Sequence, residues 1–417
     1  MTTNGTVSAN ADILGNGASG NGTLVINGGS YLATGGLGQL NLGNTTANGG
    51  GGTLTLTSGA ASIKTLVYQA GSSQAGIVNL DGGTLTLNAI TVTSGLTKEL
   101  NFNGGQFIAG ANMPAFSGLT LNVKNGGAKI NTNGFSMILA DPLLNFGGAS
   151  TGGLVKSGAG TLTLVGANNY AGGTVLNAGT LALGANNVLP ASEISLNAAT
   201  LDAATFTDTV GTLDVTGSAV INLGSGASLN FSNSSAIDWT GGTLNITGTF
   251  VSGSSIRFGN STTALTSTQL ALIAVNGSPG PYTLNSSGFL VSNPYDAWKT
   301  QITNGLDGRT EDADGDGFNN LEEFLFGTSP IAGSGSLVTT TASGNNLVLR
   351  WLQRETAATY TLKQSATLAA ESWTTVVSPI PAPDADQSGT PANYDRYQVT
   401  LPSSGGRSFF SIQGVEN

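Results

Sequence analysis

The chain of 417 residues contains no cysteine and no histidine. Without cysteine it has neither disulfide bonds nor thiolate metal ligands. Without histidine it lacks the side chain that most often exchanges protons near neutral pH. These absences exclude catalytic Ser/His and Cys/His pairs.

Charge and long apolar runs are also scarce. Only 9% of the residues are charged, and the net charge of −10 leaves no basic surface for nucleic acid. No apolar run approaches the roughly 18 residues that a transmembrane helix needs. The first residues, MTTNGTVSANADILGNG, contain neither the basic region nor the apolar core of a signal peptide. We expect no nucleic-acid partner, no transmembrane segment, and a mature or trimmed fragment in which Met1 is an added start.

The composition changes near Pro294. Residues 1–295 carry nine acidic and six basic side chains, whereas residues 296–417 carry fourteen and seven. Three of the four tryptophans also lie in the second part. We therefore predict three segments: an N-terminal domain over residues 1–294, a linker over 295–333 and a C-terminal module over 334–417.

One short phrase recurs along the N-terminal part. It reads GTLVINGG at 22–29, GGTLTLTSG at 51–59, GGTLTLNA at 82–89, GTLTLVGA at 160–167, GTLALGAN at 179–186 and GGTLNITG at 241–248. Alternation of Thr or Asn with Leu, Val or Ile is typical of a strand with one buried face, and the flanking Gly and Asn suit tight turns. Such short strands bury that face only when they are stacked, which favours a β-solenoid over residues 1–294. A chain of β-sandwich domains is the alternative, although it would need longer strands, more aromatic residues and fewer glycines.

Asparagines near the strands fit corner positions, where they tolerate a left-handed backbone and can stack their amides. They are Asn79, Asn88, Asn177, Asn197, Asn222 and Asn245.

Residues 154–184, LVKSGAGTLTLVGANNYAGGTVLNAGTLALG, carry a more specific pattern. They resemble the autotransporter-associated β-strand repeat, which runs Lys-x-Gly-x-Gly-Thr-Leu-x-Leu, then Asn-x-Tyr-x-Gly-Gly-Thr, then Gly-Thr-Leu-x-Leu-Gly. Lys156, Asn169 and Tyr170 fall on the marked positions. The resemblance implies a right-handed parallel β-helix in a large secreted or surface-displayed bacterial protein.

The chain also departs from autotransporters, which end in a translocator barrel. Here the C-terminal residues are SIQGVEN, with no series of amphipathic barrel strands before them. Self-translocation through an outer membrane is therefore not expected. The layout of strand repeats, an Asp/Gly-rich motif and a short β module is similar to that of large exported proteins of Verrucomicrobia-like bacteria.

The sequence DADGDGFNNLEE at 312–323 places five carboxylates in twelve positions. Set against an EF-hand loop, it supplies an oxygen-bearing group at each ligand position and a glycine, Gly317, at the sharp turn. The predicted Ca²⁺ ligands are Asp312, Asp314, Asp316, the carbonyl of Phe318, Asn320 and Glu323. Because Asn319 replaces the aliphatic residue of a paired EF-hand, we expect a lone structural site, similar to thrombospondin type-3-like and dockerin-like loops.

A solvated acidic turn is the alternative for this stretch, but five close carboxylates repel one another without a counter-ion. We also expect short helices over DAWKTQITN (296–304) and over NLEEFLFG, which ends at Gly327.

Residues 337–417 change to longer, aromatic-rich alternating runs, which predict a small antiparallel β-sandwich. Its aromatic residues form either its core or a sugar-stacking platform: Trp351, Tyr360, Trp373, Tyr397 and Phe409.

In the N-terminal part, Asp202, Asp208 and Asp214 recur every six residues. They are either a carboxylate ladder of a carbohydrate-active enzyme or solvated corner residues, and their Thr, Ala and Gly neighbours favour corners.

These observations favour a non-enzymatic, extracellular or cell-surface structural or adhesive protein, with a β-solenoid stalk or fibre subunit that Ca²⁺ rigidifies. The alternative is a carbohydrate-binding or carbohydrate-active β-helix protein.

Strand-like residues begin at GTVSAN (5–10) with no amphipathic cap before them. We therefore expect end-to-end solenoid stacking, with extracellular matrix or polysaccharide as the other possible partner.

Overall fold

The computed structural model describes residues 5–16, 20–44, 49–71, 74–280, 282–355, 358–402 and 408–416. The chain divides into two compact units, Met1–Val291 and Ser292–Asn417. None of the described helices is long and apolar enough to cross a membrane.

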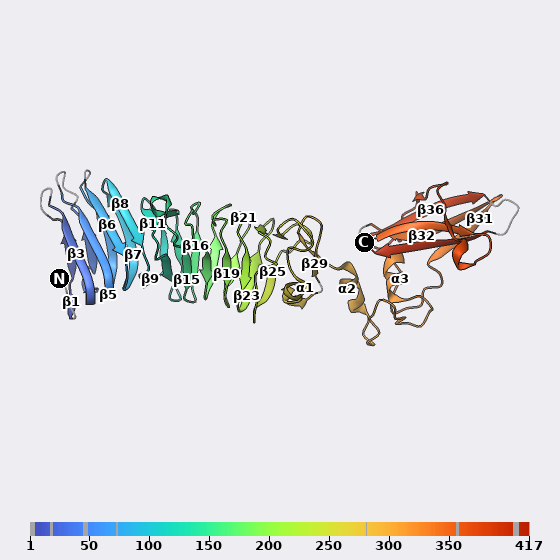
Figure 1. The fold of residues 1–417 in the computed structure, drawn as a ribbon, viewed down its shortest axis with the longest axis horizontal. Coiled ribbons are helices and arrows are strands. Elements are labelled where there is room, and N and C mark those ends of the chain that lie inside the picture. Colours follow the sequence, from blue (N-terminus) through green and yellow to red (C-terminus); the bar gives the residue numbers. More distant parts are fainter. Residues whose placement is uncertain are drawn as a thin grey trace. The chain divides into compact units, whose positions relative to one another are not determined.

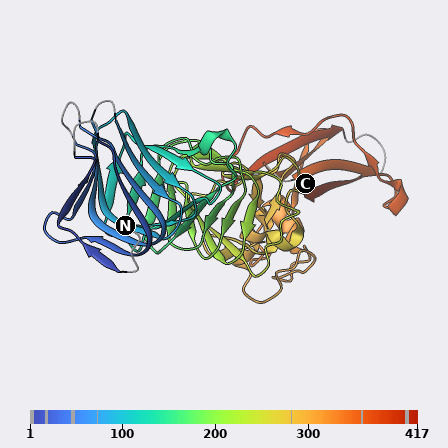
Figure 2. The same cartoon turned by 60° about the vertical axis from the view of Figure 1, so that its left-hand side comes forward.

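The first unit is a stack of coils made of short parallel strands (Figures 1 and 2). One sheet comprises β1 (Thr6–Ser8), β2 (Ala11–Leu14), β3 (Gly22–Ala33), β4 (Gln39–Leu42), β5 (Gly52–Gln69), β6 (Ala75–Leu80), β7 (Thr84–Ser94), β8 (Thr97–Phe102), β9 (Gln106–Ala109), β11 (Thr120–Val123), β12 (Ala128–Asn131), β14 (Leu143–Asn145), β15 (Leu154–Ser157), β17 (Thr174–Leu176), β19 (Ile194–Leu196) and β22 (Leu213–Val215).

Further faces of the coils form separate sheets. The second sheet comprises β10 (Met113–Phe116), β13 (Met137–Leu139), β16 (Thr161–Leu164), β18 (Thr180–Leu183), β20 (Thr200–Asp202), β23 (Ser218–Leu223), β25 (Thr243–Gly248), β27 (Ile273–Val275) and β28 (Ser278–Pro279). The third comprises β21 (Thr207–Thr209), β24 (Ser228–Phe231) and β26 (Ile256–Phe258), and a fourth pairs β29 (Tyr282–Leu284) with β30 (Leu290–Ser292). The predicted parallel β-solenoid is confirmed.

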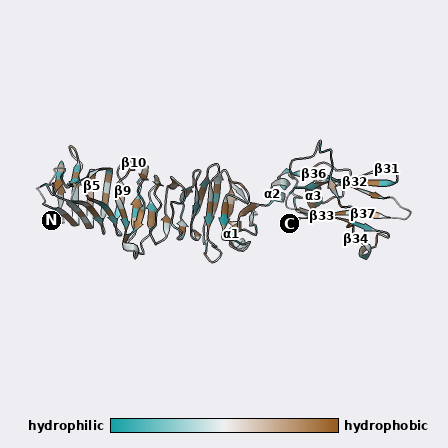
Figure 3. Ribbon diagram, turned by 90° about the horizontal axis from the view of Figure 1, so that it is seen from above, coloured by the Kyte–Doolittle hydropathy of each residue, from teal (hydrophilic) through white to brown (hydrophobic). Residues whose placement is uncertain are grey.

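The repeated phrases form the in-register columns of this solenoid. Leu162 of β16 pairs with Leu181 of β18, which pairs with Leu201 of β20, and all three side chains are fully buried. Burial of each leucine contributes about 1.5–3 kcal/mol, so the columns supply most of the driving force for stacking. The alternation of apolar and polar residues along the strands is visible in Figure 3.

Asparagine side chains stack as predicted, although several lie within strands, whereas Asn177 and Asn197 directly follow β17 and β19. The Nδ2 of Asn101 in β8 donates to the Oδ1 of Asn79 in β6 at 3.0 Å, and the Nδ2 of Asn122 in β11 donates to the Oδ1 of Asn101 at 2.7 Å. Asn222 and Asn245 likewise lie inside strands β23 and β25. Parallel, in-register pairing places like residues directly above one another, which is why the amides meet there.

The two ends of the solenoid differ. After β27 the chain reverses into the antiparallel strand β28, next to helix α1 (Ser267–Ala271), which has a Thr266–Gln269 capping box. The buried Gln269 donates to the carbonyls of Ser234 and Ile237 and so attaches the helix to the preceding coil. At the other end, the segment Gly22–Ile26 of β3 pairs with β5 on one side and with no strand on the other among the described residues.

The second unit contains two antiparallel sheets and short helices. One sheet has the order β31 (Val338–Ser343), β32 (Asn346–Arg354), β36 (Tyr394–Pro402), β35 (Ala382–Pro383); the other has the order β34 (Thr374–Thr375), β33 (Ala358–Ser365), β37 (Phe409–Glu416). The helices are α2 (Pro294–Trp298) and α3 (Asn320–Phe326), and single 3₁₀ turns cover Phe146–Gly148 in the first unit and Lys299–Gln301 and Ala370–Ser372 in the second.

Helix α3 packs into the core of this second unit. Its residues Phe324, Leu325 and Phe326 share one hydrophobic cluster with Trp351 of β32 and Leu362 of β33. The helix ends at Gly327, whose φ of 71° is the left-handed conformation that glycine adopts without strain, as predicted from the sequence. Helix α3 therefore shares one hydrophobic core with the two sheets of the second unit.

Candidate metal centre

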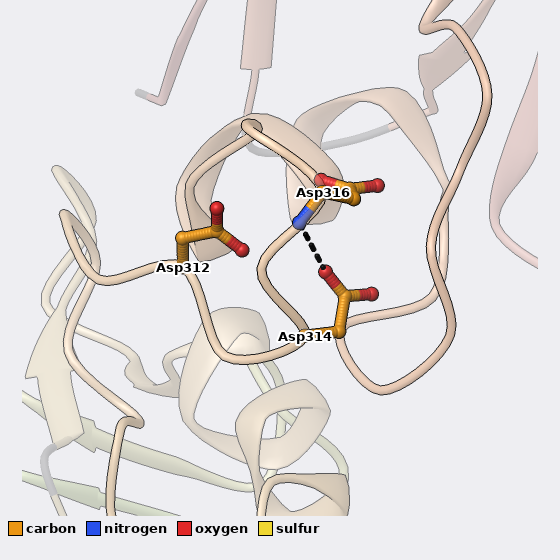
Figure 4. A group of neighbouring side chains, drawn as sticks. All are labelled: Asp312, Asp314 and Asp316. Atoms are coloured by element: carbon orange, nitrogen blue, oxygen red, sulfur yellow. Dashed lines mark hydrogen bonds between the residues drawn. The ribbon is translucent and has the colours of Figure 1, made fainter.

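The loop before α3 brings three carboxylates together. Oxygens of Asp312, Asp314 and Asp316 all lie within 4.8 Å of one another (Figure 4). The carboxylate of Asp312 accepts hydrogen bonds from the N–H groups of Gly315 at 2.7 Å and Gly317 at 2.9 Å. Both glycines have positive φ, 77° and 96°, so the loop turns sharply where the sequence provides residues without a Cβ.

The next carboxylates in the loop are held by backbone donors. The Oδ1 of Asp314 accepts from the N–H of Asp316 at 3.2 Å, and the Oδ1 of Asp316 accepts from the N–H of Phe318 at 2.9 Å. These bonds fix one oxygen of each side chain and leave other lone pairs free to face an ion. The role of the Phe318 carbonyl as a ligand stays a prediction.

The two remaining predicted ligands lie in α3, and both are fully buried. Asn320 donates through its Nδ2 to the carbonyls of Leu306 and Gly308 at 2.7 and 2.8 Å. Its Oδ1, the Oε2 of Glu323 and the Oδ2 of Asp314 are buried without a hydrogen-bond partner. Leaving buried polar atoms unpaired costs about 1–3 kcal/mol each, and more when they are charged. Three such oxygens from positions 3, 9 and 12 of the loop fit a bound cation.

The electrostatics of the loop agree with this fit. Burial, together with the negative charges of Asp314, Asp316 and Asp312, raises the pKa of Glu323 to about 7. Hydrogen bonds from the N–H groups of Phe318 and Ser334 lower the pKa of Asp316. Without a counter-charge, burial and the neighbouring carboxylates therefore favour the neutral form of Glu323. A divalent cation would offset the repulsion between these carboxylates.

Two residues that the motif does not include also touch these carboxylates. The N–H of Ser334 donates to the Oδ2 of Asp316 at 2.5 Å, and its hydroxyl donates to the Oε1 of Glu323 at 3.2 Å. The hydroxyl of Thr328 lies 3.5 Å from the same Oε1. No sequence signal marks Ser334, because the contact joins the loop to a segment beyond the helix.

The far end of α3 is held by the sheets. The hydroxyls of Tyr360 in β33 and Tyr394 in β36 donate to the carbonyls of Leu325 and Phe324. The guanidinium of Arg354 lies 4.3 Å from the centre of the Phe324 ring. These contacts satisfy helix carbonyls that would otherwise lack partners, and they anchor the helix that begins in the carboxylate loop.

The three aspartates at a spacing of six do not form a site. Asp202 lies in β20, Asp208 in β21 and Asp214 in β22, which belong to three different sheets. The predicted solvated corner is also wrong for Asp208, which is fully buried. Its carboxylate accepts from the N–H groups of Val188, Leu189 and Thr209 at 2.8–3.0 Å, and burial raises its pKa. This geometry describes a structural carboxylate that pairs backbone donors of a neighbouring coil.

Replacing Asp208 with asparagine should destabilise the solenoid by about 1–3 kcal/mol. The amide supplies a single acceptor oxygen, so at least one of the three N–H groups, of which those of Val188 and Leu189 are buried, loses its partner. Urea unfolding followed by circular dichroism measures the effect, and Asp238→Asn, at an exposed position, is the control. Equal midpoints for the two variants would contradict the structural role.

The aromatic residues of the C-terminal sheets mostly belong to the core. Trp351 is only 3% exposed, and Tyr360 and Tyr397 pack against the same hydrophobic cluster. In addition, the hydroxyl of Tyr360 donates a hydrogen bond to the carbonyl of Leu325. Trp351, Tyr360 and Tyr397 therefore belong to the core, whereas Trp373 and Phe409 are half-buried and lie outside this cluster.

A buried lysine marks the repeat in the solenoid. Lys156 of β15 is fully buried, and its Nζ donates to the carbonyls of Ser157 at 3.1 Å, Gly158 at 2.7 Å and Ala178 at 2.9 Å. Burial lowers its pKa to about 8. The nearby Tyr170, also a position of the repeat pattern, is buried and shares a 2.7 Å hydrogen bond with Thr174. Lys156 and Tyr170, two residues of the repeat pattern, therefore make buried hydrogen bonds that stabilise the coil.

Fold and pattern together define a parallel β-solenoid with an autotransporter-type repeat. Residues 154–183 match the family described as Passenger-associated-transport-repeat, which confirms the resemblance of this segment. The chain is also similar to the Adhesin BmaC autotransporter of Brucella suis biovar 1 (strain 1330), with 35% identity over 143 residues. The match covers 32% of this chain and 4% of the adhesin, so the chain spans a small part of that relative. No solved structure matches the chain.

Proposed function

We propose that the protein is a non-enzymatic structural or adhesive element of a bacterial cell surface or of the extracellular space. The observation that carries this proposal is the passenger-type repeat at residues 154–183, set in a parallel solenoid. Similarity to a curated adhesin supports the adhesive part. A solenoid suits this task because each coil contacts only its neighbours, so a long surface is built from short units.

Adhesion is tested with beads coated with the full chain. They should be retained on layers of extracellular polysaccharide or matrix protein under flow, whereas albumin-coated beads should wash away. Equal retention of both beads would contradict adhesion and leave a purely structural role.

A screen on pectins, alginate and other acidic glycans tests the absence of glycosidase or lyase activity. Glycosidase or lyase activity of the purified full chain in this screen would contradict a non-enzymatic function.

We further propose that the carboxylate loop binds one Ca²⁺ and that the ion rigidifies the second unit. Hard Ca²⁺ prefers six to eight oxygen ligands, and the loop offers carboxylate, amide and carbonyl oxygens. The ligands would be Asp312, Asp314, Asp316, the carbonyl of Phe318, Asn320 and Glu323. Three buried oxygens without partners support this proposal. Because α3 is part of the core, a bound ion would stabilise the unit rather than a loop alone.

The open edge of the solenoid supports an assembly role. The segment Gly22–Ile26 carries N–H and C=O groups on one side that no described strand covers. Val25 and Ile13 near this end are 37% and 42% exposed. An uncharged strand edge that no described strand covers favours the addition of another strand. We propose that a further coil stacks here, either from a longer parent chain or from a second copy in a fibre.

Substituting Val25 with lysine should suppress association of the full chain. A charged side chain on a strand edge opposes pairing with another strand, because its ammonium group would have to be desolvated. Sedimentation velocity over a wide concentration range should show larger particles for the wild type than for the variant. The matched control is Val165→Lys, since Val165 is also 37% exposed but lies in the body of the solenoid. A strictly monomeric wild type would refute stacking between copies.

A further inference from the structure

Two residues of the segment that follows α3 contact the proposed ligands: the hydroxyl of Thr328 lies 3.5 Å from the Oε1 of Glu323, and Ser334 contacts two carboxylates. Ser334 is half-buried and contacts two of the proposed ligands with different groups: its N–H binds Asp316, and its hydroxyl binds Glu323. Ile331 and Gly333, which precede Ser334, are exposed. Ser334 is therefore the residue of this segment whose polar groups bind both Asp316 and Glu323.

We infer that Ser334 is a positioning residue for the cation site, an inference that rests on the proposed calcium function. Its hydroxyl holds the Oε1 of Glu323, while the Oε2 of that carboxylate is left buried and without a partner. Its N–H holds the Oδ2 of Asp316, whose Oδ1 is already bound by the N–H of Phe318. Both carboxylates are thereby fixed in rotation before an ion arrives, so binding does not have to order them.

The two contacts act on positions that are distant within the loop. Asp316 is the fifth position and Glu323 the twelfth, and the helix start at Asn320 lies between them. A single residue that holds both carboxylates sets the distance between the two sides of the site. Metal sites lose about 10–100-fold in affinity when such supporting hydrogen bonds are removed.

Calorimetric titration of the full chain with calcium chloride, after chelator treatment, tests this inference. Ser334→Ala should bind Ca²⁺ about 10-fold more weakly than the wild type. Ser334→Thr keeps the hydroxyl and should restore most of the affinity. The control is Ser336→Ala, because the hydroxyl of Ser336 donates to the carbonyl of Val338 and not to a carboxylate.

Folding and positioning are separated by measuring all variants at a temperature where circular dichroism shows them to be fully folded. A residue with a purely structural role would lower the unfolding temperature of the ion-free protein and leave the calcium affinity of the folded protein unchanged. Equal affinities of wild type and Ser334→Ala would therefore overturn the inference while the calcium site stands. Absence of calcium binding by the wild type would instead overturn the proposed site, and the inference with it.

Discussion

Replacing Glu323 with alanine is expected to weaken calcium binding by at least about 100-fold. Loss of a supporting hydrogen bond already costs metal sites about 10–100-fold, and Glu323 would contact the ion itself. Its side chain is fully buried, and its Oε2 has no partner within the protein. Removal of this carboxylate therefore takes away a charge and an oxygen that the remaining loop residues do not replace.

The neighbouring acid is the matched control for this experiment. Glu322→Ala removes the same charge, but the Glu322 carboxylate accepts from the N–H of Asn319 as part of the helix cap. This control should bind calcium nearly as the wild type does, with a helix cap weakened by about 0.5–2 kcal/mol. Calorimetry and thermal unfolding with and without calcium distinguish the two effects. Similar affinities of the Glu323 and Glu322 variants would contradict the site.

The second large effect is expected in the solenoid, where Lys156→Met should lower the free energy of unfolding by about 1–3 kcal/mol. Methionine fills much of the lysine volume but donates no hydrogen bond. The carbonyls of Ser157 and Gly158 keep donors from Thr132, whereas the carbonyl of Ala178 keeps none among the described residues. Denaturant unfolding followed by circular dichroism gives the difference. Lys129→Met serves as the control, since Lys129 lies exposed in the adjacent strand β12 and should change stability by less than about 0.5 kcal/mol.

A small effect of Lys156→Met, similar to that of the control, would mean that water replaces the ammonium group at the three carbonyls. The buried lysine would then be a tolerated residue of the repeat and not a structural element of the coil.

Alternation along the chain was enough to predict the solenoid, because a period of two residues is a local property. The same pattern contained an overlooked signal at Asp208. Phe206, Asp208 and Val210 alternate with Thr207 and Thr209, so the aspartate shares the parity of two apolar neighbours. Its charge argued for an exposed position, whereas three backbone N–H groups stabilise it inside.

The carboxylate loop shows the same limit of sequence reasoning. Its candidate ligands lie within twelve residues, and their spacing predicted that the oxygens of Asp312, Asp314 and Asp316 would lie together. The remaining ligands stay a prediction. The contacts of Ser334 with the loop and of Tyr394 with α3 join residues 11 to 70 positions apart. Such contacts depend on how the second unit packs, and no local pattern encodes them.

The in-register columns of the solenoid have a consequence for how this molecule can change in length. Leu181 follows Leu162 by nineteen residues, and Leu201 follows Leu181 by twenty, yet each occupies the same place in the cross-section. Duplication or loss of one such stretch would leave every remaining column continuous. Neighbouring strands lie about 4.8 Å apart, so each added or lost coil would change the length of the solenoid by about that distance. The residues of the core would not have to change.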